Sequence, residues 1–221
     1  MNILLLGATG SIGDSVLSVI EENHSKLNLF GITFHKNINK SQEIIKDFKP
    51  QFAYVEDRST FEDQKDTSDI TFLNGDSSLK ELIEHDDVDV IISAISGFAG
   101  LKATYLAAST GKKILLANKE SIVAGGDLIT ARAKKFNSKI IPIDSEHNAI
   151  FQCLSGQRSP DDVQNITITA SGGPFIGKKI SDLKDVTKDD ALNHPNWDMG
   201  SKISIDSATL VNKCLELIEA K

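Results

Sequence analysis

The chain is poor in cysteine and in basic residues, and it lacks long apolar runs. Its 221 residues include two cysteines, Cys153 and Cys214, which lie far apart in the sequence. Each occurs among apolar neighbours in a segment with helical periodicity, so we expect two buried core thiols rather than a disulfide, a nucleophile or a metal-binding pair. A fold stabilised by disulfides is therefore not expected.

Lysine and arginine number 24 against 31 aspartates and glutamates, so the formal net charge is -7. We expect no nucleic-acid partner, because binding to nucleic acid requires a basic stripe. A bound anion would have to be held by local cationic groups rather than by the overall field of the protein.

No apolar run reaches the roughly 20 residues of a membrane-spanning helix. The chain starts directly on a strand-like segment, residues 1–6, without a charged leader. We therefore expect no membrane partner and a cytoplasmic location, or a plastid-type organelle if a transit peptide has been removed.

The first 144 residues alternate between strand and helix patterns, which is typical of an α/β fold with a mostly parallel sheet. Several expected strands are continuous apolar runs, as in strands buried on both faces. The expected strands are residues 2–6, 27–34, 52–56, 69–73, 88–95, 113–117 and 139–144. The expected helices are residues 11–22, 40–48, 77–84, 98–110, 119–136 and 147–155.

The pattern changes after Gly156. We expect a strand at 165–170, a charged segment with little strand character at 178–193, a short strand at 202–206 and a helix from about Ser207. The sequence thus predicts a Rossmann-type doubly wound domain, residues 1–143, followed by a second, α+β domain, residues 144–221. The last helix reaches Lys221 without a stop signal, so we expect the second domain to be incomplete.

A glycine-rich segment, GATGSIG at residues 7–13, lies between the first strand and the first helix. This is the context of a dinucleotide-binding turn, in which Gly7 and Gly10 allow a tight turn and Gly13 allows close packing of helix on strand. The first turn of the helix would face the pyrophosphate. The segment favours a bound dinucleotide over a turn without a ligand.

The second strand ends without the acidic residue that usually binds the ribose of NAD. Lys36, with His35 and Asn37 beside it, suits the 2′-phosphate of NADP instead. Exposed lysines are common, which is the alternative interpretation of Lys36. Lys119 and Glu120 follow a later strand at the same edge, either as site residues or as the solvated first turn of a helix.

Asp144 and Glu146 flank Ser145 at the end of the strand predicted at 139–144. Side chains alternate along a strand, so the two carboxylates would point the same way and suit Mg²⁺ or Mn²⁺. Alternatively, Asp144 or Ser145 only caps a helix that begins near His147.

On the last helix, Thr209, Asn212, Lys213 and Glu216 fall within an arc of roughly 100°. They resemble a site for an anion together with a cation, although a polar face usually means a face exposed to solvent. The turn at Ser171-Gly172-Gly173 offers a hydroxyl and backbone N–H groups to an anion, or is simply a turn before a proline.

The only tryptophan, Trp197, lies in a polar loop that begins at His194 and includes Met199. A lid over a ligand is one interpretation of this loop, and packing of Trp197 onto the domain is the other. His194 either donates a hydrogen bond to a phosphate or has a structural role.

Several motifs together resemble the 1-deoxy-D-xylulose 5-phosphate reductoisomerase family. They occur in order along almost the whole chain: GATGSIG, LLANKES, PIDSEHNAIFQ, ASGGPF, HPNWDMGSKISIDSATLVNK and LELIEA. The resemblance implies an NADPH-dependent oxidoreductase of non-mevalonate isoprenoid biosynthesis. Such an enzyme rearranges 1-deoxy-D-xylulose 5-phosphate and reduces the product to 2-C-methyl-D-erythritol 4-phosphate. It also implies a homodimer for the full-length form.

The resemblance further implies roles for individual residues. Asp144, Glu146 and Glu216 would bind Mn²⁺, Mg²⁺ or Co²⁺, and these three together with Lys119 would be catalytic. The residues expected to contact or cover the substrate are Ser145, Ser171, His194, Trp197, Met199, Ser207, Asn212 and Lys213. The residues expected to contact NADPH are Gly7, Thr9, Gly10, Ser11, Ile12, His35, Lys36, Asn37, Asn118, Glu120 and Gly200.

Two departures from the family pattern keep alternatives open. His35 stands where the family commonly has a small residue, and family members are substantially longer than this chain. The chain could therefore be a truncated, inactive NADP-binding fragment. Another two-domain NADP oxidoreductase, such as a semialdehyde dehydrogenase, would need a reactive cysteine in a polar loop, which the helical, apolar surroundings of both cysteines disfavour.

Overall fold

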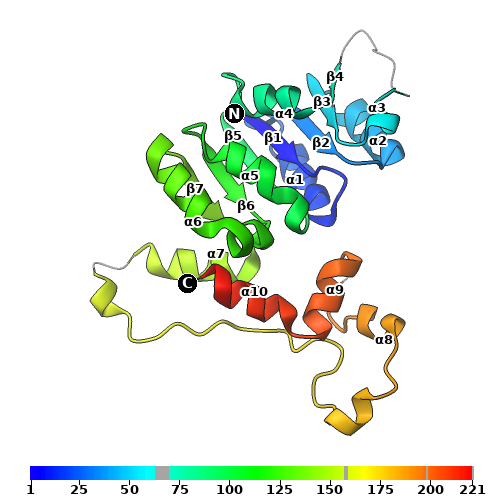
Figure 1. The fold of residues 1–221 in the computed structure, drawn as a ribbon, viewed down its shortest axis with the longest axis vertical. Coiled ribbons are helices and arrows are strands. Elements are labelled where there is room, and N and C mark those ends of the chain that lie inside the picture. Colours follow the sequence, from blue (N-terminus) through cyan, green and yellow to red (C-terminus); the bar gives the residue numbers. More distant parts are fainter. Residues whose placement is uncertain (63–69, 157–158, 198, 221) are drawn as a thin grey trace. The chain divides into compact units, whose positions relative to one another are not determined.

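The computed structural model of the chain describes residues 1–62, 70–156, 159–197 and 199–220. The chain divides into two compact units, Met1–Asp144 and Ser145–Lys221. Figure 1 shows the elements of each unit. No helix in the described part of the chain is long and apolar enough to cross a membrane.

The first unit is built on a sheet of seven parallel strands in the order β4-β3-β2-β1-β5-β6-β7. The strands are β1 (Asn2–Leu6), β2 (Asn28–Phe34), β3 (Phe52–Val55), β4 (Thr71–Leu73), β5 (Val90–Ser93), β6 (Lys113–Leu116) and β7 (Lys139–Pro142). Each lies within a predicted strand, except that residue 69 of the prediction is outside the described residues. The prediction of a doubly wound, mostly parallel α/β sheet is confirmed.

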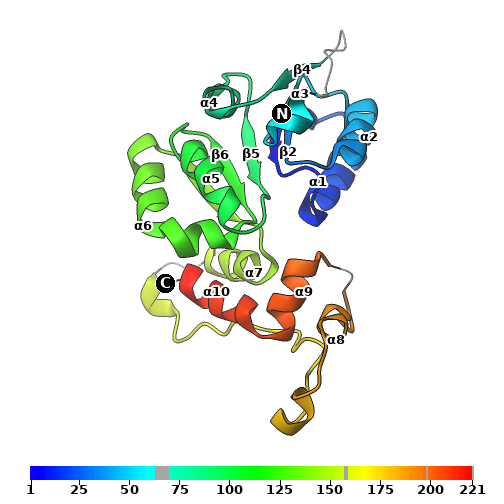
Figure 2. The same cartoon turned by 45° about the vertical axis from the view of Figure 1, so that its right-hand side comes forward.

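Helices cover both faces of this sheet, as Figure 2 shows. The helices are α1 (Ser11–Glu22), α2 (Ile38–Phe48), α3 (Arg58–Glu62), α4 (Asp76–Glu84), α5 (Leu101–Ala107) and α6 (Lys119–Phe136), with a 3₁₀ turn at Phe98–Gly100. Apolar residues of α1 and α2 pack on one face, and those of α4, α5 and α6 pack on the other. Strands buried on both faces explain the continuous apolar runs in the sequence.

The chain reverses its direction of winding between β1 and β5, which are neighbours in the sheet. The crevice at the carboxyl ends of such neighbouring strands is the usual ligand site of doubly wound sheets. The glycine-rich segment follows β1, and residues 94–97 follow β5. The topology therefore brings two of the predicted binding loops to one edge.

The second unit is helical in its described part. Its elements are α7 (Ser145–Leu154), α8 (Lys188–Leu192), α9 (Ser201–Ala208) and α10 (Val211–Glu219), with 3₁₀ turns at Pro160–Asp162 and Ile180–Leu183. The described residues of this unit contain no strand. Both strands predicted here are therefore wrong.

Residues 165–170 lack regular structure, and Ile166 is 55% exposed. Alternating β-branched residues form a strand only where a neighbouring strand accepts their backbone hydrogen bonds. Residues 202–206 lie within α9, where Gly200 is the residue before the first turn and Lys202 pairs with Asp206 at 2.6 Å. An alternating pattern of five residues is too short to exclude a helix.

The predicted burial of the cysteines is also wrong. Cys153 on α7 and Cys214 on α10 are both exposed. Leu217 and Ile218, which follow Cys214 on α10, are exposed as well. Apolar neighbours in the sequence therefore do not indicate the core in this unit.

Candidate active site

The glycine-rich segment forms a tight turn between β1 and α1. Gly7 has a φ of 86°, and a Cβ atom there would lie 2.8 Å from the carbonyl oxygen of Ala94. A Cβ atom on Gly13 would overlap the backbone of Ala8. Both positions therefore require glycine, for the reasons that the motif predicts.

The start of α1 faces solvent. Gly10, Ser11 and Ile12 are exposed, and Thr9 is partly exposed. The first N–H groups of a helix have no partner within the helix, so they attract an anion such as a pyrophosphate. The described geometry thus fits the predicted dinucleotide loop.

The residues after β2 are exposed, and two of them are engaged with the protein. Lys36 Nζ lies 3.4 Å from Oδ1 of Asp57, and Asn37 Oδ1 accepts a hydrogen bond from the N–H of Lys40 at 3.3 Å. Hydrogen bonds, of which the one from Ser59 has the largest effect and those from Thr60 come next, hold the pKa of Asp57 well below its usual range. Lys36 therefore has an anionic partner of its own as well as access to solvent.

Asn118 connects the loops that follow β5 and β6. Its amide nitrogen donates to the carbonyl oxygens of Ile95 at 2.6 Å and Gly97 at 2.9 Å, and lies 3.0 Å from Oε2 of Glu120. Its amide oxygen accepts from the N–H of Ser121 at 3.0 Å. The side chain is 2% exposed, so its first role is to hold the two loops together.

Lys119 and Asp144 form a buried ion pair within the first unit. Lys119 Nζ lies 2.6 Å from Oδ2 of Asp144, and the two side chains are 6% and 12% exposed. Oδ1 of Asp144 is buried and has no hydrogen-bond partner in the described part of the chain. A buried acceptor without a donor is costly, and such an oxygen suits a hard cation.

The structure corrects the strand argument for Asp144 and Glu146. β7 ends at Pro142 and α7 begins at Ser145, so the two carboxylates do not alternate along one strand. Ser145 is exposed, and Glu146 lies in the first turn of α7. A carboxylate at this end of a helix is stabilised by the helix dipole.

Glu216, on the predicted polar stripe, faces the protein, whereas much of the apolar face of α10 is exposed. Glu216 is 0% exposed, whereas Leu217 is 66% exposed. Oε1 of Glu216 accepts from the amide of Asn212 at 2.6 Å, and Oε2 accepts from Nζ of Lys213 at 2.6 Å. The alternative of a polar face exposed to solvent is therefore wrong for Glu216.

Lys213 connects Glu216 to a carboxylate on another helix. Its ammonium group forms a second ion pair with Oε1 of Glu146 on α7. Two carboxylates, from α7 and α10, thus converge on one cation. The same donor set would fit a divalent metal with oxygen ligands.

Ser171 and His194 are in contact within the second unit. His194 Nε2 lies 3.0 Å from Ser171 Oγ, and Nδ1 accepts from the N–H groups of Asn196 and Trp197 at 3.2 and 3.1 Å. Because Nδ1 accepts, the neutral ring carries its proton on Nε2 and donates it to Ser171. Ser171 then keeps its own proton for a ligand.

The turn after residue 170 approaches α9 closely. Gly172 and Gly173 have φ values of 85° and 66°. A Cβ atom on Gly173 would lie 2.9 Å from the carbonyl oxygen of Ser207. The structure thus brings Ser207 next to the turn that carries Ser171.

The remaining predicted residues of this unit lie in or beside the same loop. Trp197 is 64% exposed, Met199 is partly exposed, and Gly200 precedes the first turn of α9. Exposure of Trp197 disfavours its packing onto the domain. The lid remains a prediction.

Two buried residues beside the carboxylates were missed from the sequence. His147 Nε2 lies 2.9 Å from the carbonyl oxygen of Glu216, and Nδ1 lies 2.8 Å from Oε2 of Glu219. Glu219 is three residues after Glu216 and so shares its face of α10. That spacing was one signal, and the other was that both residues lie in motifs of the resemblance, PIDSEHNAIFQ and LELIEA.

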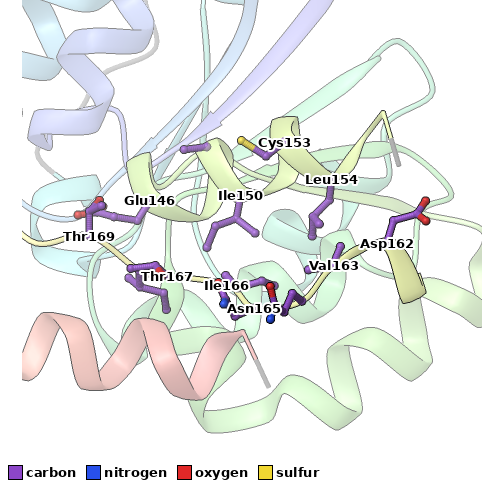
Figure 3. A pocket seen from close by; sticks show the side chains of 13 residues that line it. Glu146, Ile150, Cys153, Leu154, Asp162, Val163, Asn165, Ile166, Thr167 and Thr169 are labelled. Carbon is purple, nitrogen blue, oxygen red and sulfur yellow. The ribbon is translucent and has the colours of Figure 1, made fainter. Parts of the chain in front are cut away.

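A pocket of about 420 Å³ lies between α7 and residues 162–169. Figure 3 shows Glu146 at one end and Leu154 and Asp162 at the other. Ile150, Leu154 and Val163 are among the residues that line it. Glu146 is the only lining residue that the sequence assigned to a site.

Comparisons with known proteins agree along the whole chain. Residues 3–126 match the model of 1-deoxy-D-xylulose 5-phosphate reductoisomerase, and residues 140–221 match the model of the C-terminal domain of that enzyme. A relative from Francisella tularensis subsp. novicida, named 1-deoxy-D-xylulose 5-phosphate reductoisomerase, is 50% identical over 221 residues. A relative of the same name from Vesicomyosocius okutanii is 44% identical. Each alignment covers 99% of this chain and 57% of the relative.

Solved structures give the same result. A crystal structure of DOX-P reductoisomerase in complex with NADPH, fosmidomycin and magnesium has a TM-score of 0.90 and 42% identity, covering 100% of this chain and 57% of the other. The reductoisomerase of Zymomonas mobilis in complex with NADPH has a TM-score of 0.86 and 40% identity, covering 99% of this chain and 57% of the other.

The chain therefore spans little more than half the length of these relatives. Its sequence and its fold nevertheless match them from one end to the other, as the motifs predicted. The chain belongs to the 1-deoxy-D-xylulose 5-phosphate reductoisomerase family.

Proposed function

We propose that this chain carries the cofactor-binding and metal-binding parts of an NADPH-dependent reductoisomerase. The reaction is the rearrangement and reduction of 1-deoxy-D-xylulose 5-phosphate to 2-C-methyl-D-erythritol 4-phosphate. The observation that carries the proposal is the convergence of Glu146 and Glu216 on the ammonium group of Lys213. A domain that only binds a cofactor has no need of such a cluster.

Asp144, Glu146 and Glu216 would hold the divalent metal. Asp144 has a buried oxygen that lacks a donor in the described part of the chain. It is two residues from Glu146, so their Cα atoms lie within about 7.5 Å whatever the conformation between them. Magnesium is present in a related crystal structure, and Mn²⁺ and Co²⁺ also accept oxygen ligands.

When bound, the metal would polarise the carbonyl and hydroxyl oxygens of the substrate. Lys119 would orient Asp144 through their 2.6 Å ion pair. Ser145, exposed at the start of α7, would donate a hydrogen bond to the same substrate oxygens. These residues would orient the reacting carbons.

The phosphate of the substrate would be bound by groups remote from the reacting carbons. Ser171 would donate its hydroxyl proton, because His194 already donates to its oxygen. Ser207, Asn212 and Lys213 would supply further donors, and the loop carrying Trp197 and Met199 would cover the substrate. Binding free energy from such contacts can be used to orient the reacting part of the substrate.

The first unit would bind NADPH. Gly7, Thr9, Gly10, Ser11 and Ile12 would contact the pyrophosphate. His35, Lys36 and Asn37 would contact the 2′-phosphate. Asn118, Glu120 and, from the second unit, Gly200 complete the proposed set. We accordingly assign residues 1–143 to the cofactor and residues 144–221 to the metal and substrate, with a homodimer for the full-length form.

A second candidate is a fragment that binds NADPH without turnover. The observation that favours it is length, since the alignment with the Francisella relative covers only 57% of that protein. Residues that relatives contribute beyond this length could be needed to complete the substrate site. The two candidates differ in turnover and agree in cofactor binding.

The test is to follow NADPH oxidation by the loss of its near-ultraviolet absorbance, with 1-deoxy-D-xylulose 5-phosphate and Mn²⁺. Turnover that requires Mn²⁺ and is lost in Asp144→Asn supports the reductoisomerase. Asp47→Asn, an exposed carboxylate on α2, is the matched control and should retain the parent rate. Saturable NADPH binding without turnover supports the fragment, and absence of both contradicts the proposal.

A further inference from the structure

His147 and Glu219 form a buried pair that none of the proposed roles uses. Their side chains are 8% and 6% exposed. His147 lies in the first turn of α7, directly after Glu146, and Glu219 is the last residue of α10, three after Glu216. Each member of the pair is therefore next to a proposed metal ligand, on the same helix.

The imidazole of His147 contacts α10 at two points. One ring nitrogen lies 2.9 Å from the carbonyl oxygen of Glu216, and the other lies 2.8 Å from the carboxylate of Glu219. Both partners are acceptors, so a ring nitrogen that carries a proton donates to the partner it faces, and a ring protonated at both nitrogens donates to both. A donor at the carboxyl end of a helix also interacts favourably with the helix dipole.

These contacts fix the last turn of α10 against the first turn of α7. The carbonyl oxygen that His147 binds belongs to Glu216 itself, so the contact acts on the backbone from which this carboxylate extends. The separation of the Glu146 and Glu216 carboxylates depends on that helix contact. Glu219 orients the imidazole ring of His147, which makes this contact with Glu216.

We infer that Glu219 is a positioning residue that acts through His147 to set the distance between Glu146 and Glu216 for a divalent metal. The inference rests on the metal site of the proposed function. Partners of this kind orient metal ligands, and their loss typically weakens metal binding by a factor of 10 to 100. We therefore expect Glu219→Ala to raise the Kd for Mn²⁺ about tenfold.

A purely electrostatic effect of Glu219 on the metal would change the Mn²⁺ affinities of the variants in a different way. Glu219→Ala removes a negative charge and so weakens cation binding through space. His147→Ala removes no negative charge, so charge alone predicts unchanged or tighter binding. Positioning predicts weaker binding in both variants, and a double variant little worse than either, because the two residues act as one unit.

The experiment is a calorimetric titration of the whole chain with MnCl₂. The variants are Glu219→Ala, Glu219→Gln, His147→Ala, the double variant and Glu216→Gln. The glutamine variant keeps an acceptor oxygen for the imidazole, so it should retain part of the affinity. Asp206→Asn is the matched control, because it removes a carboxylate and its ion pair with Lys202 on α9 in the same unit.

Circular dichroism and thermal unfolding would confirm that each variant is folded at the temperature of titration. A purely structural role of the pair would lower the Tm and leave the Kd for Mn²⁺ unchanged. Binding that depends on Glu216 but changes less than twofold in Glu219→Ala and His147→Ala overturns the positioning role alone. Absence of saturable Mn²⁺ binding in the parent chain overturns the proposed metal site and the positioning role together.

Discussion

The ammonium group of Lys213 lies where the Glu146 and Glu216 carboxylates converge, so it competes with any metal for the same oxygens. We expect Lys213→Met to tighten Mn²⁺ binding by about 1 kcal/mol, roughly fivefold, since the pair is only partly shielded from solvent. Binding of inorganic phosphate should weaken, because a proposed phosphate ligand is lost. Separate titrations with each ion would measure both effects.

Lys202 provides the control for this prediction, because it also pairs with a carboxylate in the second unit. Lys202→Met should leave both affinities unchanged. Equal Mn²⁺ affinity in the parent and in Lys213→Met would contradict the competition.

Asp57 should make the first unit sensitive to acid. Hydrogen bonds from Ser59 and Thr60 lower its pKa in the folded chain, so folding favours the ionised form. The resulting stability is fully present above the ordinary aspartate pKa of about 3.9 and is lost as the pH falls below it toward the folded value. We expect urea midpoints of the parent and Asp57→Asn to differ at pH 7 and to converge as the pH is lowered below about 4. A constant difference across this range would show that Asp57 does not contribute to acid sensitivity.

At the scale of elements, the loops after β5 and β6 depend on one amide. Asn118→Ala removes hydrogen bonds to Ile95, Gly97 and Ser121 in a buried position. We expect the free energy of unfolding to fall by about 3 kcal/mol, since buried backbone groups lose their partners. Denaturant unfolding measures this loss.

Asn23→Ala is the comparison for this element-scale prediction. The amide of Asn23 makes one exposed hydrogen bond, to the carbonyl oxygen of Val19 at 2.9 Å. Its loss should cost less than about 1 kcal/mol. If the two variants were equally stable, Asn118 would not hold the loops together.

At the scale of the whole molecule, the two units should respond to different ligands. A ligand that binds only the folded form protects the segments that it stabilises from hydrogen exchange. We expect NADPH to protect residues 7–13 and 34–37, and Mn²⁺ to protect the first turn of α7 and the last turn of α10. Hydrogen exchange followed by mass spectrometry would resolve these segments. Protection of α1 by Mn²⁺ alone would contradict this division of roles.

Much of the first unit was predictable because its strands are buried on both faces. Runs such as residues 88–95 and 113–117 are mostly apolar. Gly7 is required by its positive φ, and Gly13 is required by its contact with Ala8 inside the same turn. The proposed type of cofactor and the candidate carboxylates come from motifs in the sequence, and both stay predictions. The local sequence pattern was sufficient to predict an element where local steric constraints or burial on both faces determined its structure.

In the second unit, tertiary contacts determined the secondary structure and the burial of side chains. Residues 202–206 alternate like a strand but form part of α9, because a strand needs a neighbour to accept its hydrogen bonds. Glu216 is buried on the side of α10 where Glu146 and His147, about 70 residues earlier in the chain, contact this helix. The sequence by itself determined the parallel sheet, the dinucleotide turn and the family. Only the tertiary structure decided which face of α10 is buried and how His147 and Glu219 lie beside Glu216, because burial of a polar group depends on partners from distant segments.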